Sequence, residues 1–310
     1  MRILTSILTL ALLASAPTTT NATGNNDTFT VLVFSKTNGF RHKEAIEAGI
    51  PALKQLGQAL NFKVDATEDA AAFTTENLKN YQAIILLNTT GDFLADRPAK
   101  NATQEKRAKA TADLEARKHA FKTHIENGGA LIGLHSATDG FHNKGENWPL
   151  FHQIIGGSFQ HHPHHQNGRL LIADPTHPSV AHLKALTAQP GTKDAAWTCY
   201  DEWYNFKNLQ KDNHIILNLD PTSGKGHRTN HYADGTECPT HPFAWTRTFG
   251  KGKIFYTSRG HYGKAFAEYD YIQHIIGGLY WALDRPTPKV DPELVKTFAP
   301  KPKPKARPKQ

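Results

Sequence analysis

The feature that most constrains the fold is an alternation of short, mainly apolar segments with longer segments of helical spacing. The runs at Phe29–Ser35, Ala83–Asn88 and Ala130–Leu134 have the length and composition of strands. Apolar residues recur every three or four positions over Lys43–Leu60, and a further helix is predicted over Thr111–Glu126. Apolar strands that alternate with helices form parallel sheets covered on both faces. The sequence therefore predicts an α/β fold with a mainly parallel, doubly wound sheet.

The rest of the chain continues this pattern and adds a hairpin. Further elements are a strand over Phe62–Ala66, a helix over Trp148–Ile155, strands over His214–Leu219, Phe243–Phe249 and Lys253–Ser258, and a final helix over Tyr271–Leu283. The short segment Gly250–Gly252 joins the last two strands as an added β-hairpin. The polar stretch Leu94–Ala112 is either a surface insertion or an extension of the helix after it. We expect one domain over residues 29–285, because Pro286 and Pro288 follow.

The N-terminus has the pattern of a secretory signal peptide. Arg2 precedes the apolar run Ile3–Leu13, which is too short for a membrane-spanning helix, and small residues follow as far as Ala22. Cleavage after Ala22 would leave residues 23–28 as a linker. This predicts a secreted or periplasmic protein, and an uncleaved N-terminal anchor is the alternative.

Basic charge is concentrated at the other end of the chain. The chain has 36 Lys and Arg against 28 Asp and Glu, yet no acid follows Glu293 while six basic residues do. Residues 286–310 alternate Lys with Pro, which favours an extended, solvated tail. Such a tail could contact anionic surfaces, or it could serve only as a disordered, solubilising segment. The remainder is nearly neutral and predicts no specific nucleic-acid partner.

Two cysteines remain after the predicted export. Cys199 and Cys238 would close a loop of about forty residues if they paired, as an oxidising compartment permits. Two free, buried thiols are the alternative. Neither cysteine lies in a motif that would activate it as a nucleophile.

Polar residues follow the predicted strands at the edge where an open parallel sheet binds its ligands. These segments are Ser35–His42, Asn88–Phe93, His135–Phe141 and Ser258–His261. Each carries His, Asp, Arg or amide side chains. A single histidine at such a place is usually a packing or capping residue, but four polar strand ends together predict one cleft.

A resemblance to a known family covers Thr30 to Asp284. Gly129–His135 resembles the strand and sharp turn of class I glutamine amidotransferase-like proteins, with His135 where those enzymes have a nucleophilic cysteine. The whole set of motifs resembles the trehalose-utilisation (ThuA-like) family: Phe40–His42, Asn88–Asp92, Asp139, Gly156–Phe159 before His162–Pro163, Asp201–Tyr204, Pro242–Trp245 and Gly252–His261. The resemblance implies a flavodoxin-like or class I glutamine amidotransferase-like fold and a role in carbohydrate metabolism. It also implies 3-keto-sugars as ligands, made by an upstream sugar dehydrogenase, and it argues against amidotransfer.

The matched motifs supply residues for acid–base and metal chemistry. We assign His135, Asp139 and Glu202 as catalytic candidates and His135, His162 and His261 as metal-ligand candidates, because two or three imidazoles with a carboxylate suit Zn²⁺ or another divalent ion. The substrate-binding candidates are Arg41, His42, Asn88, Asp92, Tyr204 and Arg259. His135 is interpreted as a ligand or the general base, the alternative being a turn residue bonded to Asp139.

Two local patterns limit these assignments. His161, His162, His164 and His165 form a dense cluster that could be a metal-binding tract, but only His162 matches the family motif, and the other three fit a polar, solvated loop equally well. Asp201 and Glu202 are adjacent and would point to opposite faces of an extended segment, with Glu202 inside the cleft.

Several functions remain compatible with these residues. The first is an enzyme that isomerises, eliminates or hydrolyses a 3-keto-glycoside or disaccharide. The alternatives are a noncatalytic carbohydrate-binding module and a metal-dependent hydrolase of an unoxidised glycoside or ester. The chain has no Gly-x-Ser-x-Gly elbow, which argues against a serine hydrolase. Trp148, Trp203 and Tyr204 offer faces for a sugar ring, or they pack in the core.

Overall fold

The computed structural model describes residues 28–142, 147–183 and 196–299. The predicted signal peptide and residues 300–310 of the basic tail lie outside the described residues, as does the linker up to residue 27. Among the described residues, no helix combines the length and the hydropathy that a bilayer span requires.

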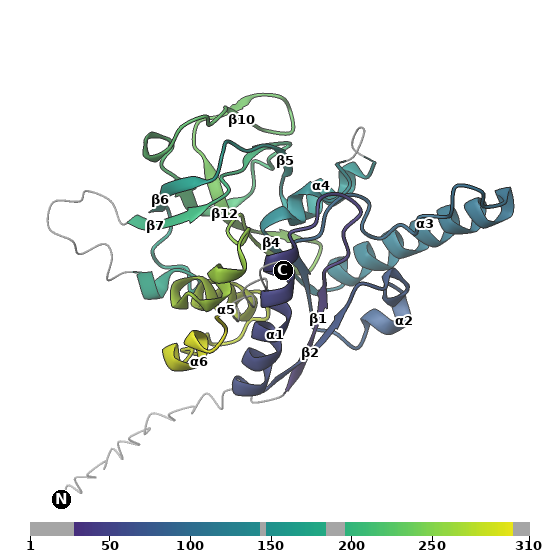
Figure 1. Ribbon diagram of the computed structural model, residues 1–310, viewed down its shortest axis with the longest axis horizontal. Helices are drawn as coiled ribbons and strands as arrows, with labels where there is room; N and C mark the ends of the chain where they lie inside the picture. Colours follow the sequence, from purple (N-terminus) through teal and green to yellow (C-terminus); the bar gives the residue numbers. More distant parts are fainter. Residues whose placement is uncertain (1–27, 143–146, 184–195, 300–310) are drawn as a thin grey trace, which may run out of the picture.

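A single nine-stranded sheet forms the centre of the molecule, in the order β2-β1-β3-β4-β13-β12-β9-β6-β7 (Figure 1). The strands are β2 (Phe62–Thr67), β1 (Phe29–Phe34), β3 (Ala83–Leu87), β4 (Ala130–Leu134), β13 (Gly252–Thr257), β12 (Pro242–Phe249), β9 (His214–Leu219), β6 (Gln166–Ile172) and β7 (Ala196–Asp201). The five strands from β2 to β13 pair in parallel, and the four from β12 to β7 continue the sheet through antiparallel pairs. The predicted α/β class and the hairpin are confirmed. The hairpin begins an antiparallel half of the sheet that the sequence pattern did not predict in full.

Helices cover both faces of the parallel half. One face carries α1 (Lys43–Ala59), α5 (Tyr269–Ala282) and α6 (Pro292–Lys296), and the other carries α2 (Thr75–Leu78), α3 (Gln104–Glu126) and α4 (Pro149–Ile155). Alternate residues of β1 serve the two cores: Val31 and Val33 pack with α1 and α5, while Leu32 and Phe34 pack with α2 and α3. This two-sided burial explains why the strands are apolar without alternation.

Smaller elements complete the fold. β5 (Ser158–His161) pairs with β8 (Asn205–Lys207), and β10 (Asn230–His231) pairs with β11 (Glu237–Cys238). Short 3₁₀ segments are η1 (Ala70–Ala72), η2 (His135–Asp139), η4 (Pro221–Ser223) and η5 (Gly263–Ala267).

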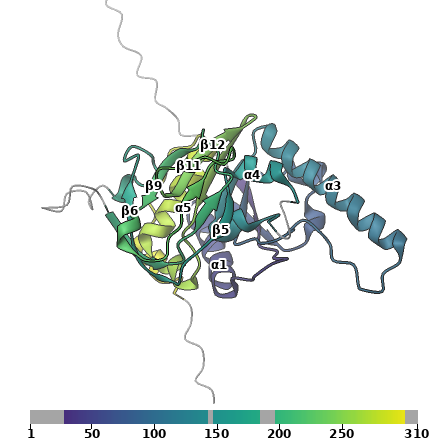
Figure 2. The ribbon, with the colours of Figure 1, turned by 90° about the horizontal axis from the view of Figure 1, so that it is seen from above.

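The polar stretch that begins at Leu94 becomes helical at Gln104. Thr103 caps α3, since its hydroxyl accepts a hydrogen bond from the backbone N–H of Lys106 at 3.3 Å. α3 therefore starts seven residues before the predicted Thr111. Both views show that its first turns reach out beyond the sheet (Figures 1 and 2).

The folded body extends past residue 285, where we expected it to end. Val290, Val295 and Phe298 are buried in the same core as α5. Asp291 caps α6 by accepting the backbone N–H of Glu293 at 2.9 Å, and a proline opens its first turn. The prolines after α5 thus end one helix and lead into another that packs on the first.

The predicted disulfide is not formed. Cys199 and Cys238 are both free and buried. The physical reason is their position: Cys199 belongs to the core beneath α5, whereas Cys238 belongs to the core on the opposite face of the sheet. The sequence alternative of two buried thiols is the one that the structure shows, and burial raises the pKa of Cys199 to about 12.

Candidate functional site

A cluster of titratable side chains lies where the parallel strands end. His42 precedes α1 in the segment after β1, His135 follows β4, and His261 lies in the loop after β13. Glu202 directly follows β7, at the far edge of the antiparallel half. Four segments far apart in sequence therefore meet at the edge of the sheet where α/β proteins bind ligands.

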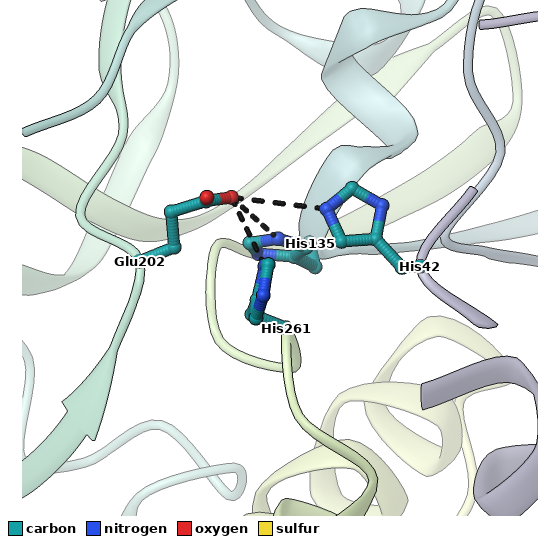
Figure 3. A group of neighbouring side chains, drawn as sticks. All are labelled: His42, His135, Glu202 and His261. Atoms are coloured by element: carbon teal, nitrogen blue, oxygen red, sulfur yellow. Dashed lines mark hydrogen bonds and ion pairs between the residues drawn. The ribbon is translucent and has the colours of Figure 1, made fainter. Parts of the chain in front are cut away.

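The Glu202 carboxylate faces the three imidazoles, and interactions run from it to each of them (Figure 3). Its Oε2 is 3.2 Å from Nε2 of His135, 3.2 Å from Nδ1 of His261 and 3.7 Å from Nε2 of His42. One nitrogen or oxygen from each of the four residues lies within 4.8 Å of all the others. His42, His135 and Glu202 are buried, and His261 is partly buried.

The backbone fixes His135 in this position. Its φ of 50° lies in the left-handed region, which turns the chain sharply from β4 into η2. The ring is fully buried, and its Nδ1 lies 2.7 Å from the carbonyl oxygen of Ser258. Because a carbonyl only accepts, Nδ1 donates this bond, and Nε2 of the neutral ring is left as a lone pair that faces Glu202.

Asp201 organises the loop that carries His261. Its carboxylate accepts the backbone N–H groups of Gly260 at 3.0 Å and of His261 at 3.2 Å. Gly260 has a φ of 123°, and a Cβ there would lie 2.2 Å from the Tyr271 hydroxyl, so this position needs glycine. The expected division between the two adjacent acids is therefore found: Asp201 holds backbone, and Glu202 enters the cluster.

A second pair of histidines approaches Glu202 from the segment between β5 and β6. His165 Nε2 lies 2.8 Å from Glu202 Oε1, and His162 Nε2 lies 3.3 Å from the same oxygen. Of the two alternatives for His165, the solvated loop does not hold, because β6 begins at the next residue and carries the ring toward β7. His164 is exposed, and the ring of His161 stacks beside that of His162.

Neighbouring imidazoles hold the charge on the central carboxylate. Burial alone would raise the pKa of Glu202, but the side chains of His135, His261 and His42 beside it keep that pKa far below its usual range. Burial would likewise lower the pKa of His135, and the Glu202 carboxylate raises it instead. Burial lowers the pKa of His42 to about 4, so this ring is neutral at neutral pH. A carboxylate surrounded by imidazole nitrogens is a donor set for a cation.

Tyr204 adds a hydroxyl to the inner side of the cluster. Its oxygen lies 3.1 Å from His135 Nε2, which can accept from it because the other ring nitrogen donates to Ser258. Burial raises the pKa of Tyr204 well above its ordinary value, so the phenol keeps its proton. It can therefore donate a hydrogen bond to an oxygen that gains charge nearby.

Asp139 lies apart from the four clustered residues. Its carboxylate pairs with Nδ1 of His142 at 3.2 Å. The ring of Phe159 lies 6.0 Å from the His142 ring and 5.9 Å from the His162 ring. The expected contact between Asp139 and His135 is replaced by this imidazole–carboxylate pair at the rim.

The remaining predicted substrate-binding residues have structural partners. Asn88 donates to the carbonyl oxygen of Gly260 at 3.1 Å, and Asp92 accepts from Asn147 at 3.0 Å. Arg41 pairs with Glu68 at 2.6 Å near the surface. Arg259 is buried, pairs with Glu268 and lies over the Trp197 ring at 4.8 Å. Asn88 thus positions the loop of His261, and Arg259 supports the core behind it.

Two histidines of the site have positions that the sequence did not predict. His42 was expected to bind substrate, yet it lies among the possible metal ligands. His165 lay outside the matched motif, although its spacing from His162 was a usable signal. Two histidines three residues apart within a His-rich segment are typical of metal-binding tracts.

Comparison with known proteins agrees with this architecture. The family model described as ThuA, trehalose utilisation, matches residues 30–282. A ThuA-like protein from Bacteroides uniformis is 22% identical, with a TM-score of 0.60 over 86% of this chain and 95% of that one. A ThuA-like protein from Parabacteroides merdae is 17% identical, with a TM-score of 0.53 over 85% and 93% of the two chains. No curated protein matches the chain. The family model spans most of the sequence and the fold agrees with it, so this chain belongs to the ThuA trehalose-utilisation family.

Proposed function

We propose that this protein is a metal-dependent enzyme that acts on an oxidised sugar, a 3-keto-glycoside or 3-keto-disaccharide. The family links the chain to carbohydrate metabolism. The observation that carries the proposal is the meeting of His42, His135, His261 and Glu202 at the ligand-binding edge of the sheet. Three imidazoles and one carboxylate are a donor set that Zn²⁺ and similar divalent ions prefer.

The spacing of these donors fits a cation. Ligands of a tetrahedral Zn²⁺, each about 2.1 Å from the ion, lie roughly 3.4 Å from one another. The separations of Glu202 Oε2 from the three imidazoles are 3.2, 3.2 and 3.7 Å. His135 also has the usual outer partner of a metal ligand, a backbone carbonyl that accepts from its other nitrogen.

The proposed chemistry is proton removal beside a ketone. A divalent cation held by these four residues would have to expand to a fifth ligand to take the carbonyl oxygen, and would then polarise it and acidify the adjacent C–H group. Glu202 is a poor base because its pKa is held so low, which favours its role as a ligand. The Asp139–His142 pair is better suited to accept the proton, since a carboxylate orients the imidazole. Tyr204 can donate to the enolate oxygen.

The same proton removal explains how a glycosidic bond could be broken. Loss of the proton at C2 leaves its electron pair in an enolate with the C3 ketone. When that pair forms a C1–C2 double bond, the C1–O bond breaks and the second sugar leaves, taking a proton. Reprotonation of the enolate without this loss gives isomerisation. Either route requires that an upstream dehydrogenase first oxidise the C3 hydroxyl.

Two exposed aromatic rings near the cluster offer surfaces for a sugar. Phe40 is 68% exposed, and its ring lies edge-on to His42 at 4.9 Å. Tyr200 is 40% exposed and packs on Tyr262, whose ring lies 4.5 Å from that of His261. Trp203 is fully buried and Trp148 packs on the core, so these two side chains serve packing.

The test compares a 3-keto-disaccharide with its parent sugar. We expect the mature protein, purified with its metal content measured, to consume the keto-sugar and to leave the parent sugar unchanged. Removal of the metal with a chelator should abolish turnover, and Zn²⁺ should restore it. Turnover of the parent sugar would instead support a metal-dependent hydrolase. Sugar binding without turnover, in protein that contains no metal, would support a noncatalytic module.

A further inference from the structure

We propose that Glu202 bridges two divalent cations, the inner one held by His42, His135 and His261 and an outer one held by His162 and His165. This inference rests on the proposed function, because the inner cation is the one proposed above. It adds a second site in the outer part of the cluster, together with a role for the His-rich segment between β5 and β6.

The two carboxylate oxygens divide the surrounding rings into two groups. Oε2 faces His42, His135 and His261, whereas Oε1 faces His165 at 2.8 Å and His162 at 3.3 Å. The outer donors also lie within 4.8 Å of one another. A carboxylate that offers one oxygen to each group is the arrangement that bridges paired metals about 3.5–4 Å apart.

The orientation of the His162 ring supports a cation at the outer position. Its Nδ1 lies 2.9 Å from the carbonyl oxygen of Pro163, so Nδ1 carries the hydrogen of the neutral ring and donates it. Nε2 is then a lone pair that faces Oε1 of Glu202. Two acceptors at this distance repel unless a proton or a cation lies between them.

Histidines of both groups form a hydrogen bond through the ring nitrogen that faces away from Glu202. His135 donates its Nδ1 hydrogen to Ser258, and His162 donates its own to Pro163, while Nδ1 of His165 is bonded to the Tyr262 hydroxyl. Metal-bound imidazoles use their second nitrogen in this way, which fixes the ring and the tautomer. His162 and His165 thus share this feature of a metal ligand with His135.

The two positions differ in their access to solvent. The inner group supplies four protein ligands and is largely buried. The side chains of His162 and His165 are 37% and 33% exposed, and a hollow lined by residues 161–166 with Lys225 and Gly226 opens beside them. An outer cation with only three protein ligands keeps positions for oxygen atoms of the substrate. Adjacent oxygens of a keto-sugar are ligands of this kind.

The experiment measures the stoichiometry of Zn²⁺ binding to the mature, full-length protein. The protein is first freed of metal with a chelator, then titrated by calorimetry and checked by elemental analysis after dialysis. We expect two equivalents in the wild type. The double variant His162→Ala/His165→Ala should bind one equivalent, with affinity at the outer site lowered at least tenfold.

His164→Ala is the matched control, because it removes an exposed imidazole from the same segment and should keep two equivalents. Circular dichroism of the double variant checks that it folds. As a readout independent of turnover, Mn²⁺ in the wild type should give the electron paramagnetic resonance spectrum of a coupled pair, and the double variant that of an isolated ion.

The outcomes separate this inference from the proposed function. One equivalent in the wild type would overturn the bridged pair. If the double variant retains that equivalent, the inner site stands, and if the double variant loses it, the inner site is overturned as well. Two equivalents that the double variant retains would place the second ion elsewhere and also overturn it. An absence of Zn²⁺ binding would overturn both proposals.

Discussion

At the scale of single residues, Glu202 is the side chain around which the chemistry is arranged. Its carboxylate is contacted by five imidazoles, which come from the segments after β1, β4 and β13 and from the segment between β5 and β6. If one inner histidine is replaced, no neighbouring imidazole can take over as the missing ligand, because the other imidazoles already face the same carboxylate. The rim pair Asp139–His142 is separate and can be tested separately.

His135→Ala and Asp139→Asn are expected to lower the activity for different reasons. Loss of His135 should lower the Zn²⁺ content and reduce turnover of the keto-sugar at least a hundredfold, because an inner donor is gone. Asp139→Asn should reduce kcat by about a hundredfold with full Zn²⁺ content, because only the orientation of the His142 base changes. Elemental analysis and steady-state kinetics check both, with His164→Ala as the control. An Asp139→Asn enzyme with unchanged kcat would remove Asp139 from the mechanism.

At the scale of elements, α6 shows how composition at a chain end can mislead. The segment after Arg285 contains prolines and lysines, which suggested a solvated tail. Its large apolar residues, Val290, Leu294, Val295 and Phe298, were too few to reveal a periodic pattern, yet Val290, Val295 and Phe298 are buried in the core and Leu294 packs against it. A five-residue helix has little stability of its own, so packing on α5 holds it.

Phe298→Ala should lower the free energy of unfolding by about 3 kcal/mol, since it deletes a buried aromatic ring. Chemical denaturation of the mature protein measures this. Lys289→Ala, an exposed position in the same segment, should change stability by less than about 0.5 kcal/mol. Deleting the chain after Lys296 should also destabilise it, because Phe298 is lost. Equal stability of all these variants would show that α6 contributes nothing to the core.

At the scale of the whole molecule, buried histidines couple the fold to pH. Burial lowers the pKa of His42, His124, His177 and His241 to about 4 and that of His274 to about 3. The folded protein therefore binds fewer protons than the unfolded chain between pH 6.5 and pH 4. Its stability must fall as the pH decreases through this range. His135 contributes in the opposite direction, because its pKa is raised, but it is outnumbered.

The melting temperature of the metal-free protein should accordingly drop between pH 7 and pH 5. Each such histidine accounts for about 2 kcal/mol at pH 5 as an upper estimate. His274→Leu should show a smaller drop over the same range than the wild type, because His274 is fully buried and its Nε2 has no hydrogen-bond partner. Differential scanning calorimetry at a series of pH values measures both. Identical pH dependence in the two proteins would exclude His274 as a contributor.

The sequence by itself determined the parallel half of the sheet, because strands buried on both faces must be apolar throughout and their helices show regular spacing. It also identified His135, His162, His261 and Glu202, since strand ends and family motifs are local features. Only the tertiary structure decided which of these meet. The inner histidines come from the parallel half, whereas Glu202, His162 and His165 come from the antiparallel half. Local patterns carry no information on how two halves of a sheet join, so the division of five imidazoles between two carboxylate oxygens emerged only from the folded chain.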